Sequence, residues 1–130
     1  NDYDQTNIPS GLNNVAAIAA GWNHSLALTA EGRVVGWGSN GSGQTNIPSG
    51  LSNVVAIAAG GQHSLALTAA GRVVGWGLND VGQTTIPSGL TNVVAVAAGE
   101  RAGICMIAEP TWICAVVAAI HAIGVTASVP

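Results

Sequence analysis

The sequence predicts an all-β protein made of tandem repeats, and two observations lead to this prediction. First, the chain of 130 residues matches itself at a shift of 39, so that Pro9, Pro48 and Pro87 fall at the same position of successive units. Second, the apolar runs within each unit are short, and Gly, Asn or Pro ends each of them. Such runs are typical of strands, because helices need longer periodic stretches. A fixed period of this length indicates one supersecondary unit per repeat.

The first unit begins with the apolar run VAAIAA over residues 15–20. Ala is the best helix former, but six residues cannot sustain an isolated helix and Gly21 follows them. A strand is therefore expected there. The alternating run HSLALT over residues 24–29 predicts a second strand, and RVVGWG over residues 33–38 predicts a third. The intervening AEG fits a hairpin turn in which Gly32 takes the left-handed conformation.

The fourth piece, QTNIPSGL over residues 44–51, contains Pro48. Proline donates no hydrogen bond to a sheet, so a strand here is expected to be very short or to lie at a sheet edge. Three or four strands per 39 residues, in several copies, are typical of a β-propeller blade. We therefore predict a partial propeller of about three blades.

The chain holds 3.3 units (130/39) and divides at the repeat boundaries. The expected parts are a strand of a preceding blade over 1–12, a first blade over 13–51, a second over 52–90, and a degenerate third blade with a tail over 91–130. Pro110 stands where the earlier units have a turn glycine. Beyond Pro110 a longer strand, a short helix over about 115–123, and a segment that pairs with another molecule all remain open.

Composition excludes several classes of function. Only 7% of the residues are charged, with three Arg, no Lys and a net charge of -3, while 48% are hydrophobic. A disordered chain needs the opposite balance, and three cations cannot form a nucleic-acid surface. The richest apolar stretch, residues 112–125, is too short to span a membrane, and no signal peptide is visible. Low charge favours self-association.

The pattern AAGxxHSLALTxxGRVVGWGxNxxGQ resembles the repeat of the regulator of chromosome condensation family, whose members form seven-bladed β-propellers. The short spacing and the GQTxIP segment are also similar to bacterial secreted relatives, including the β-lactamase-inhibitory propeller. The resemblance covers residues 1–99. It implies a non-enzymatic binding scaffold in an extracellular location, and it transfers no particular partner.

Cys105 and Cys114 are the only cysteines. A two-residue turn at Glu109-Pro110 would place them opposite each other, at a distance that a disulfide can bridge. A three-residue loop would place their sulfurs on opposite faces, as buried free thiols. Two cysteines without a histidine cluster make a zinc site improbable, and we expect no metal or cofactor.

His24 and His63 occupy the same repeat position, before a serine. A ligand or acid–base pair is one interpretation. Repetition favours the other, a structural hydrogen-bonding element in each blade, since active sites are usually singular. Gln44 and Gln83 repeat in the same way and are also interpreted as structural. His121 lies in the divergent tail without a carboxylate nearby in sequence.

Trp37 and Trp76 are expected to pack between blades, although rings flanked by glycines could also bind a sugar or peptide. Trp22 occupies a position that varies among the units, which makes it the better candidate for an exposed contact. Asn23 and Asn40 begin glycosylation sequons, of which Asn40 is the more accessible in a turn, although chance occurrence is the favoured explanation for both.

No catalytic constellation can be assembled from this sequence. The acids fall at expected turns, and no nucleophile elbow, phosphate loop or paired carboxylates are present. We therefore predict a protein that is not an enzyme. We expect a binding module whose protein or glycan partner is unknown, with a structural fibre subunit and a carbohydrate-binding lectin as alternatives.

Three units cannot close a propeller ring, and open blades expose strand edges that few charges protect. Self-association through residues 1–12 and 111–130 is therefore expected. Three outcomes remain open: the sequence is a piece of a longer chain, two copies complete one ring, or copies join head to tail in a filament.

Overall fold

The computed structural model describes residues 1–107 and 113–117, and the described part is all-β. Nine strands form three separate antiparallel sheets of three strands each. The first sheet contains β1 (Val15–Ala20), β2 (His24–Thr29) and β3 (Val34–Gly38); the second contains β4 (Val54–Ala59), β5 (His63–Thr68) and β6 (Val73–Gly77); the third contains β7 (Val93–Ala98), β8 (Ala102–Ile107) and β9 (Ile113–Val117). The strands β1 to β8 are those that the repeat predicts, including the alanine-rich β1. Beyond Pro110 the sequence left several conformations open, and residues 113–117 form the strand β9.

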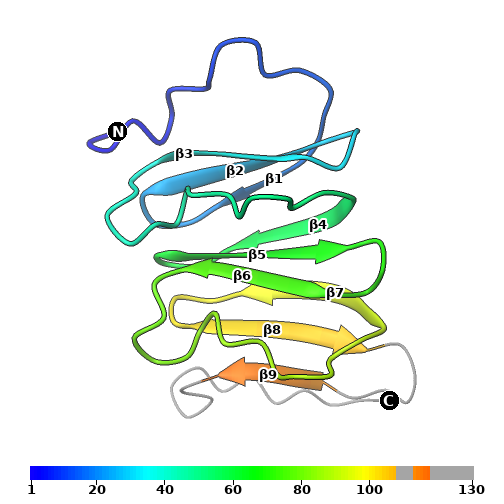
Figure 1. Ribbon diagram of the computed structural model, residues 1–130. Helices are drawn as coiled ribbons and strands as arrows, with labels where there is room; N and C mark the ends of the chain where they lie inside the picture. Colours follow the sequence, from blue (N-terminus) through cyan, green and yellow to red (C-terminus); the bar gives the residue numbers. More distant parts are fainter. Residues whose placement is uncertain (108–112, 118–130) are drawn as a thin grey trace.

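The three sheets are stacked face to face along the chain, with the N-terminal segment at one end (Figure 1). In each sheet the strands follow sequence order, and β4 packs against β1 and β2 while β7 packs against β4 and β5. The register repeats as well, since Ala27 faces Val35 in the first sheet and Ala66 faces Val74 in the second. The fold is therefore a series of propeller-type blades.

The hairpin between β2 and β3 has the turn that the sequence predicts. Gly32 N–H donates to the Thr29 carbonyl at 3.0 Å, and Thr29 N–H donates to the Arg33 carbonyl at 2.9 Å. Gly32 has φ of 79°, a conformation that glycine adopts without steric cost. Gly71 repeats it with φ of 78° in the hairpin between β5 and β6.

The strand expected over residues 1–12 is not present, and neither is a fourth strand in the first two units, at residues 44–51 and 83–90. Residues 1–12 and 44–51 form turns and irregular segments instead, and pairing of residues 1–12 with a sheet edge of a second copy stays a prediction. Side chains satisfy the backbone locally, because Thr6 N–H donates to Asn1 Oδ1 at 2.8 Å and Tyr3 N–H donates to Gln5 Oε1 at 3.1 Å. Such bonds offer the backbone an alternative to a sheet.

The core lies between neighbouring sheets rather than within one of them. Leu26 and Leu65 are buried at the centre of the first and second sheets. The cluster that joins these two sheets contains the buried residues Leu26, Leu28, Val34, Val54, Ala66 and Trp76. A smaller cluster, formed by Leu67 and Val93, joins the second sheet to the third. Each sheet is thus stabilised mainly by burial against the next one.

The third sheet has a longer hairpin connection than the other two, and its register places Cys105 opposite Cys114. This is the register that the sequence requires for a disulfide, and the bridge itself stays a prediction. We expect the oxidised, unfolded protein to show no reactive thiols, and two after reduction. The short loop that the bridge closes should add about 2–3 kcal/mol to the free energy of unfolding. Two reactive thiols before reduction would contradict the prediction.

Candidate interaction surfaces

A repeated polar contact joins each turn segment to the sheet that follows it. The Gln44 carbonyl accepts hydrogen bonds from Ser64 Oγ and Trp76 Nε1, both at 2.9 Å. The Gln5 carbonyl accepts the equivalent bonds from Ser25 Oγ at 2.9 Å and Trp37 Nε1 at 2.8 Å. Trp76 is buried between the first and second sheets, whereas Trp37 binds its turn segment in the same way on the outward side of the first sheet.

The glutamine side chains fix the shape of these turns. Gln44 and Gln83 are 2% and 0% exposed. Gln44 Oε1 accepts from Ser42 N–H at 2.9 Å, and Gln83 Oε1 accepts from Val81 N–H at 3.0 Å. A buried amide that accepts a backbone N–H within its own turn has a structural function, because it replaces a bond to water.

His24 and His63 are both buried, in equivalent places at the start of β2 and β5. His24 Nε2 lies 3.0 Å from Ser64 Oγ of the next sheet, so the imidazole links two sheets. Burial, and secondarily the charge of His63, lower the pKa of His24 to about 4. A ring that is neutral and closed to solvent at neutral pH is not available for acid–base work on a substrate.

Trp22 lies at the surface, where its variable repeat position predicts an exposed contact. Its side chain is 55% exposed, and its backbone N–H donates to the Gly61 carbonyl at 3.3 Å. Gly61 N–H in turn donates to the Glu100 carbonyl at 3.2 Å. The connections between the first and second strands of the three sheets thus form one hydrogen-bonded row.

The sequon residues differ in exposure. Asn40 is exposed and Asn23 is half-buried. The Asn40 side chain takes part in its turn, where Nδ2 donates to Asn46 Oδ1 at 2.7 Å and Oδ1 accepts from Thr45 N–H at 3.0 Å. A glycan on Asn40 would have to coexist with these two bonds.

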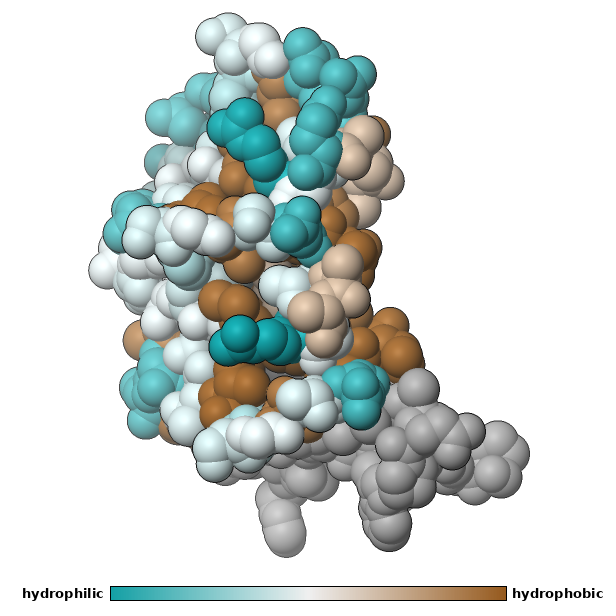
Figure 2. Space-filling view, turned by 45° about the vertical axis from the view of Figure 1, so that its right-hand side comes forward, coloured by the Kyte–Doolittle hydropathy of each residue, from teal (hydrophilic) through white to brown (hydrophobic). Residues whose placement is uncertain are grey.

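The outward side of the first sheet is an apolar hollow of about 640 Å³, which we call the open face. Its lining includes Ile8, Leu12, Val15, Ile18 and Trp37. Ile18 is 78% exposed and Val15 is 44% exposed. The space-filling view shows apolar residues at several levels of the described stack, with hydrophilic residues at its N-terminal end and again further along it (Figure 2).

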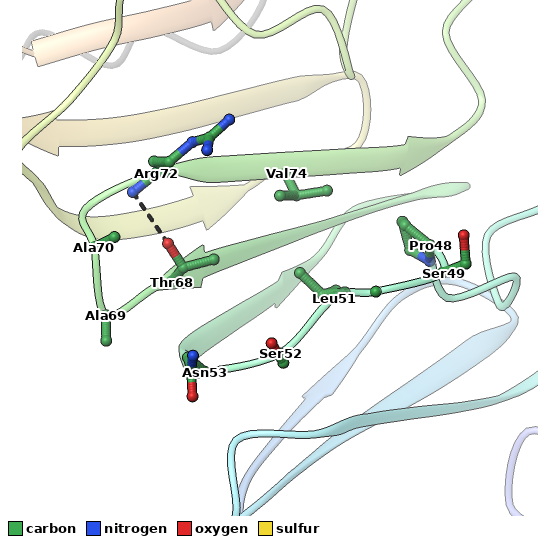
Figure 3. A pocket seen from close by; sticks show the side chains of 11 residues that line it. Pro48, Ser49, Leu51, Ser52, Asn53, Thr68, Ala69, Ala70, Arg72 and Val74 are labelled. Carbon is green, nitrogen blue, oxygen red and sulfur yellow. Dashed lines mark hydrogen bonds between the residues drawn. The ribbon is translucent and has the colours of Figure 1, made fainter.

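Two equivalent grooves lie between a PSGL segment and a hairpin turn. The groove of the second sheet, of about 660 Å³, is lined by residues that include Pro48, Leu51, Thr68, Ala70 and Arg72 (Figure 3). The groove of the first sheet, of about 460 Å³, has the counterparts Pro9, Leu12, Thr29, Glu31 and Arg33. Sequence reasoning missed both grooves, although the shift of 39 already aligns Arg33 with Arg72 and Glu31 with Ala70.

Neither a metal centre nor a membrane span is found in the described part of the chain. Residues 1–107 and 113–117 contain no group of three or more His, Cys, Asp or Glu that could hold a metal ion. The same residues include no helix that is long and apolar enough to cross a membrane.

Comparison with solved structures identifies propellers that contain the same arrangement. The chain superimposes on Prp20p from Saccharomyces cerevisiae with a TM-score of 0.65 and 26% identity, over 83% of this chain and 32% of that one. It matches human WBSCR16 with a TM-score of 0.66 and 23% identity, over 83% and 34%. It matches the ectodomain of the receptor kinase CR4 from Physcomitrella patens with a TM-score of 0.67 and 25% identity, over 78% and 28%.

The chain therefore spans about one third of the length of these structures. A search of curated proteins found no match. The family profile described as the regulator of chromosome condensation (RCC1) repeat matches residues 15–44 and 54–83. Each match begins with the first strand of a sheet and ends at the buried glutamine of the turn that follows, Gln44 or Gln83. These two segments match the RCC1 repeat, and the solved structures that the chain resembles include RCC1-type β-propellers.

Proposed function

We propose that this protein is a non-catalytic protein-binding module that self-associates through the open face of its first sheet. RCC1-like propellers are generally protein-interaction modules, and Prp20p is described as binding Gsp1p and histones. The proposed occupant of the open face is the third sheet of a second copy.

One observation carries this proposal: the open face of the first sheet is equivalent to the face that the second sheet buries against the first sheet. The counterparts of Ile8, Leu12, Val15, Ile18 and Trp37 are Ile47, Leu51, Val54, Ile57 and Trp76, and all five belong to the cluster between the first two sheets. Val54 is 4% exposed in that interface, whereas Val15 is 44% exposed on the open face.

The open face also offers a polar group for this contact. Ser64 Oγ meets the His24 imidazole of the preceding sheet, but the third sheet has Ala102 at the histidine position, so Ser25 on the open face gains no equivalent bond. The Gly61 carbonyl accepts a hydrogen bond from Trp22 N–H across the same interface. A second copy that stacks in the same geometry would therefore bury apolar surface and meet an acceptor already in place, which favours specific over random association.

Particle mass in dilute solution tests the proposal. We expect the wild-type protein to exceed the monomer mass at micromolar concentration, and Ile18→Glu to return it to the monomer, because a carboxylate on the open face would be buried without a partner. The matched control is Val55→Glu, since Val55 is 55% exposed outside the open face. A stable wild-type monomer, or equal effects of both variants, would contradict self-association.

The same contact supports a structural role if it does not close. Head-to-tail stacking that fails to form a ring gives a filament, which electron microscopy of a concentrated sample distinguishes from closed particles.

The exposed ring of Trp22 supports a lectin as a second candidate. Sugar-induced changes in tryptophan fluorescence that are absent in the Trp22→Ala variant would favour the lectin.

We also propose an extracellular location, supported by the resemblance to secreted relatives. The blade boundaries at residues 13, 52 and 91 stay a prediction.

A further inference from the structure

The hairpin turn of the first sheet holds a carboxylate. Asn14 Nδ2 donates to Glu31 Oε1 at 3.2 Å. The backbone N–H of Glu31 itself, the Thr29 hydroxyl and the nearby Arg33 guanidinium also stabilise the charged form, and together they lower the pKa of Glu31. The carboxylate lies at the protein surface, and the Asn14 amide of the neighbouring segment holds it by a hydrogen bond.

The second sheet repeats this turn without the carboxylate. Gly71 N–H donates to the Thr68 carbonyl and Thr68 N–H donates to the Arg72 carbonyl, both at 2.9 Å, as in the first sheet. Asn53 has φ of 54° and its counterpart Asn14 has φ of 53°, so the backbone that presents the amide is also the same. The residue at the position of Glu31 is Ala70.

The groove beside this turn is the larger of the two. Figure 3 shows residues 68–72 of the hairpin on one side of it and residues 48–53 on the other. Leu51 and Val74 give it an apolar floor, and among the described residues that line it Arg72 is the only charged one. The groove of the first sheet contains Glu31 together with Arg33, so its charge is already balanced.

We propose that the groove of the second sheet binds an acidic side chain of an extended peptide segment from a partner protein. The carboxylate takes the place that Glu31 occupies in the first sheet, among the Asn53 amide, the Thr68 hydroxyl, the backbone N–H of Ala70 and Arg72. An apolar residue next to the acid packs on Leu51 and Val74. The inference rests on the proposed role in protein binding, but it uses a surface separate from the open face.

Titration of the ¹⁵N-labelled full chain with the capped dipeptide acetyl-Glu-Val-amide, followed by nuclear magnetic resonance, tests the site. We expect saturable shifts of the backbone amides of residues 68–72 and of the Asn53 side-chain amide. The neutral acetyl-Gln-Val-amide should bind at least about tenfold more weakly, because it lacks the charge that Arg72 attracts. Equal binding of the two peptides, or shifts that do not saturate, would overturn the proposal.

Two exchanges between the sheets provide matched variants. In the Ala70→Glu variant the new carboxylate should occupy the site and compete with the peptide. We therefore expect it to weaken binding of acetyl-Glu-Val-amide at least about tenfold. Glu31→Ala should open a second site, with new shifts in residues 29–33. Unchanged binding in Ala70→Glu would refute the site, since circular dichroism can verify that the fold is retained. Ile18→Glu should bind the peptide like the wild type, so failure of self-association and failure of this site are distinguishable.

Discussion

Replacing Gly60 by Ala is expected to lower the free energy of unfolding by about 4 kcal/mol or more, the range in which single substitutions are exceptional. Gly60 is buried between the second and third sheets. A Cβ atom there would overlap Cε1 of the His63 ring and the carbonyl oxygen of Gly99. The carbonyl belongs to backbone, so relief requires the two sheets to separate. Urea unfolding followed by tryptophan fluorescence measures the loss.

The matched control is Gly41→Ala. A Cβ at Gly41 meets nothing within 4 Å, and its φ lies outside the positive range that strains other residues. This variant should unfold within about 0.5 kcal/mol of the wild type. A Gly60→Ala protein as stable as Gly41→Ala would show that the sheets are not packed as closely as described.

The strands were predictable because each lies in a short run bounded by residues that end it. Gly21 and Gly60 follow the first strands, and Gly32 closes the hairpin with the predicted left-handed conformation. The structural interpretation of His24 and Trp76 could also be made from repetition alone. Their actual partners could not, because Ser64 and the Gln44 carbonyl lie on other elements that only the stacking brings near.

The sequence did not predict that the segments between sheets form turns rather than short strands. The run QTNIPSGL has the apolar residues of a strand, yet local bonds of the kind Thr45 N–H to Asn40 Oδ1 at 3.0 Å compete with a sheet ladder. The twin grooves were missed for a different reason. Glu31 and Arg33 look like ordinary turn residues until the neighbouring PSGL segment forms the opposite wall.

Acidification from pH 6.5 to 4 is expected to cost this protein on the order of 3 kcal/mol of stability through His24 alone. His24 is 1% exposed, and burial together with the charge of His63 lowers its pKa from 6.5 to about 4. Within the described residues its Nδ1 has no hydrogen-bond partner, so no acceptor compensates a second proton. The folded state therefore keeps the neutral ring where the unfolded state already binds a proton.

The direction follows from this difference in proton binding. Above pH 6.5 the ring is neutral in both states and its titration changes nothing. Between pH 6.5 and 4 the unfolded chain binds more protons, so stability falls as the pH falls. Below pH 4 both states are protonated, and His24 adds no further loss. This dependence is opposite to that of a histidine whose charged form is stabilised by folding.

The His24→Gln variant separates this effect from the titration of carboxylates. We expect it to be less stable than the wild type at pH 7, because a buried contact to Ser64 is altered, and to lose about 3 kcal/mol less than the wild type between pH 7 and pH 4. Urea unfolding at several pH values gives both quantities. Nuclear magnetic resonance of the His24 Cε1 proton in the folded protein provides an independent check, with a midpoint expected near 4. A midpoint near 6.5 would mean that the ring reaches water in the folded state, and the close stacking of the first two sheets would then be wrong.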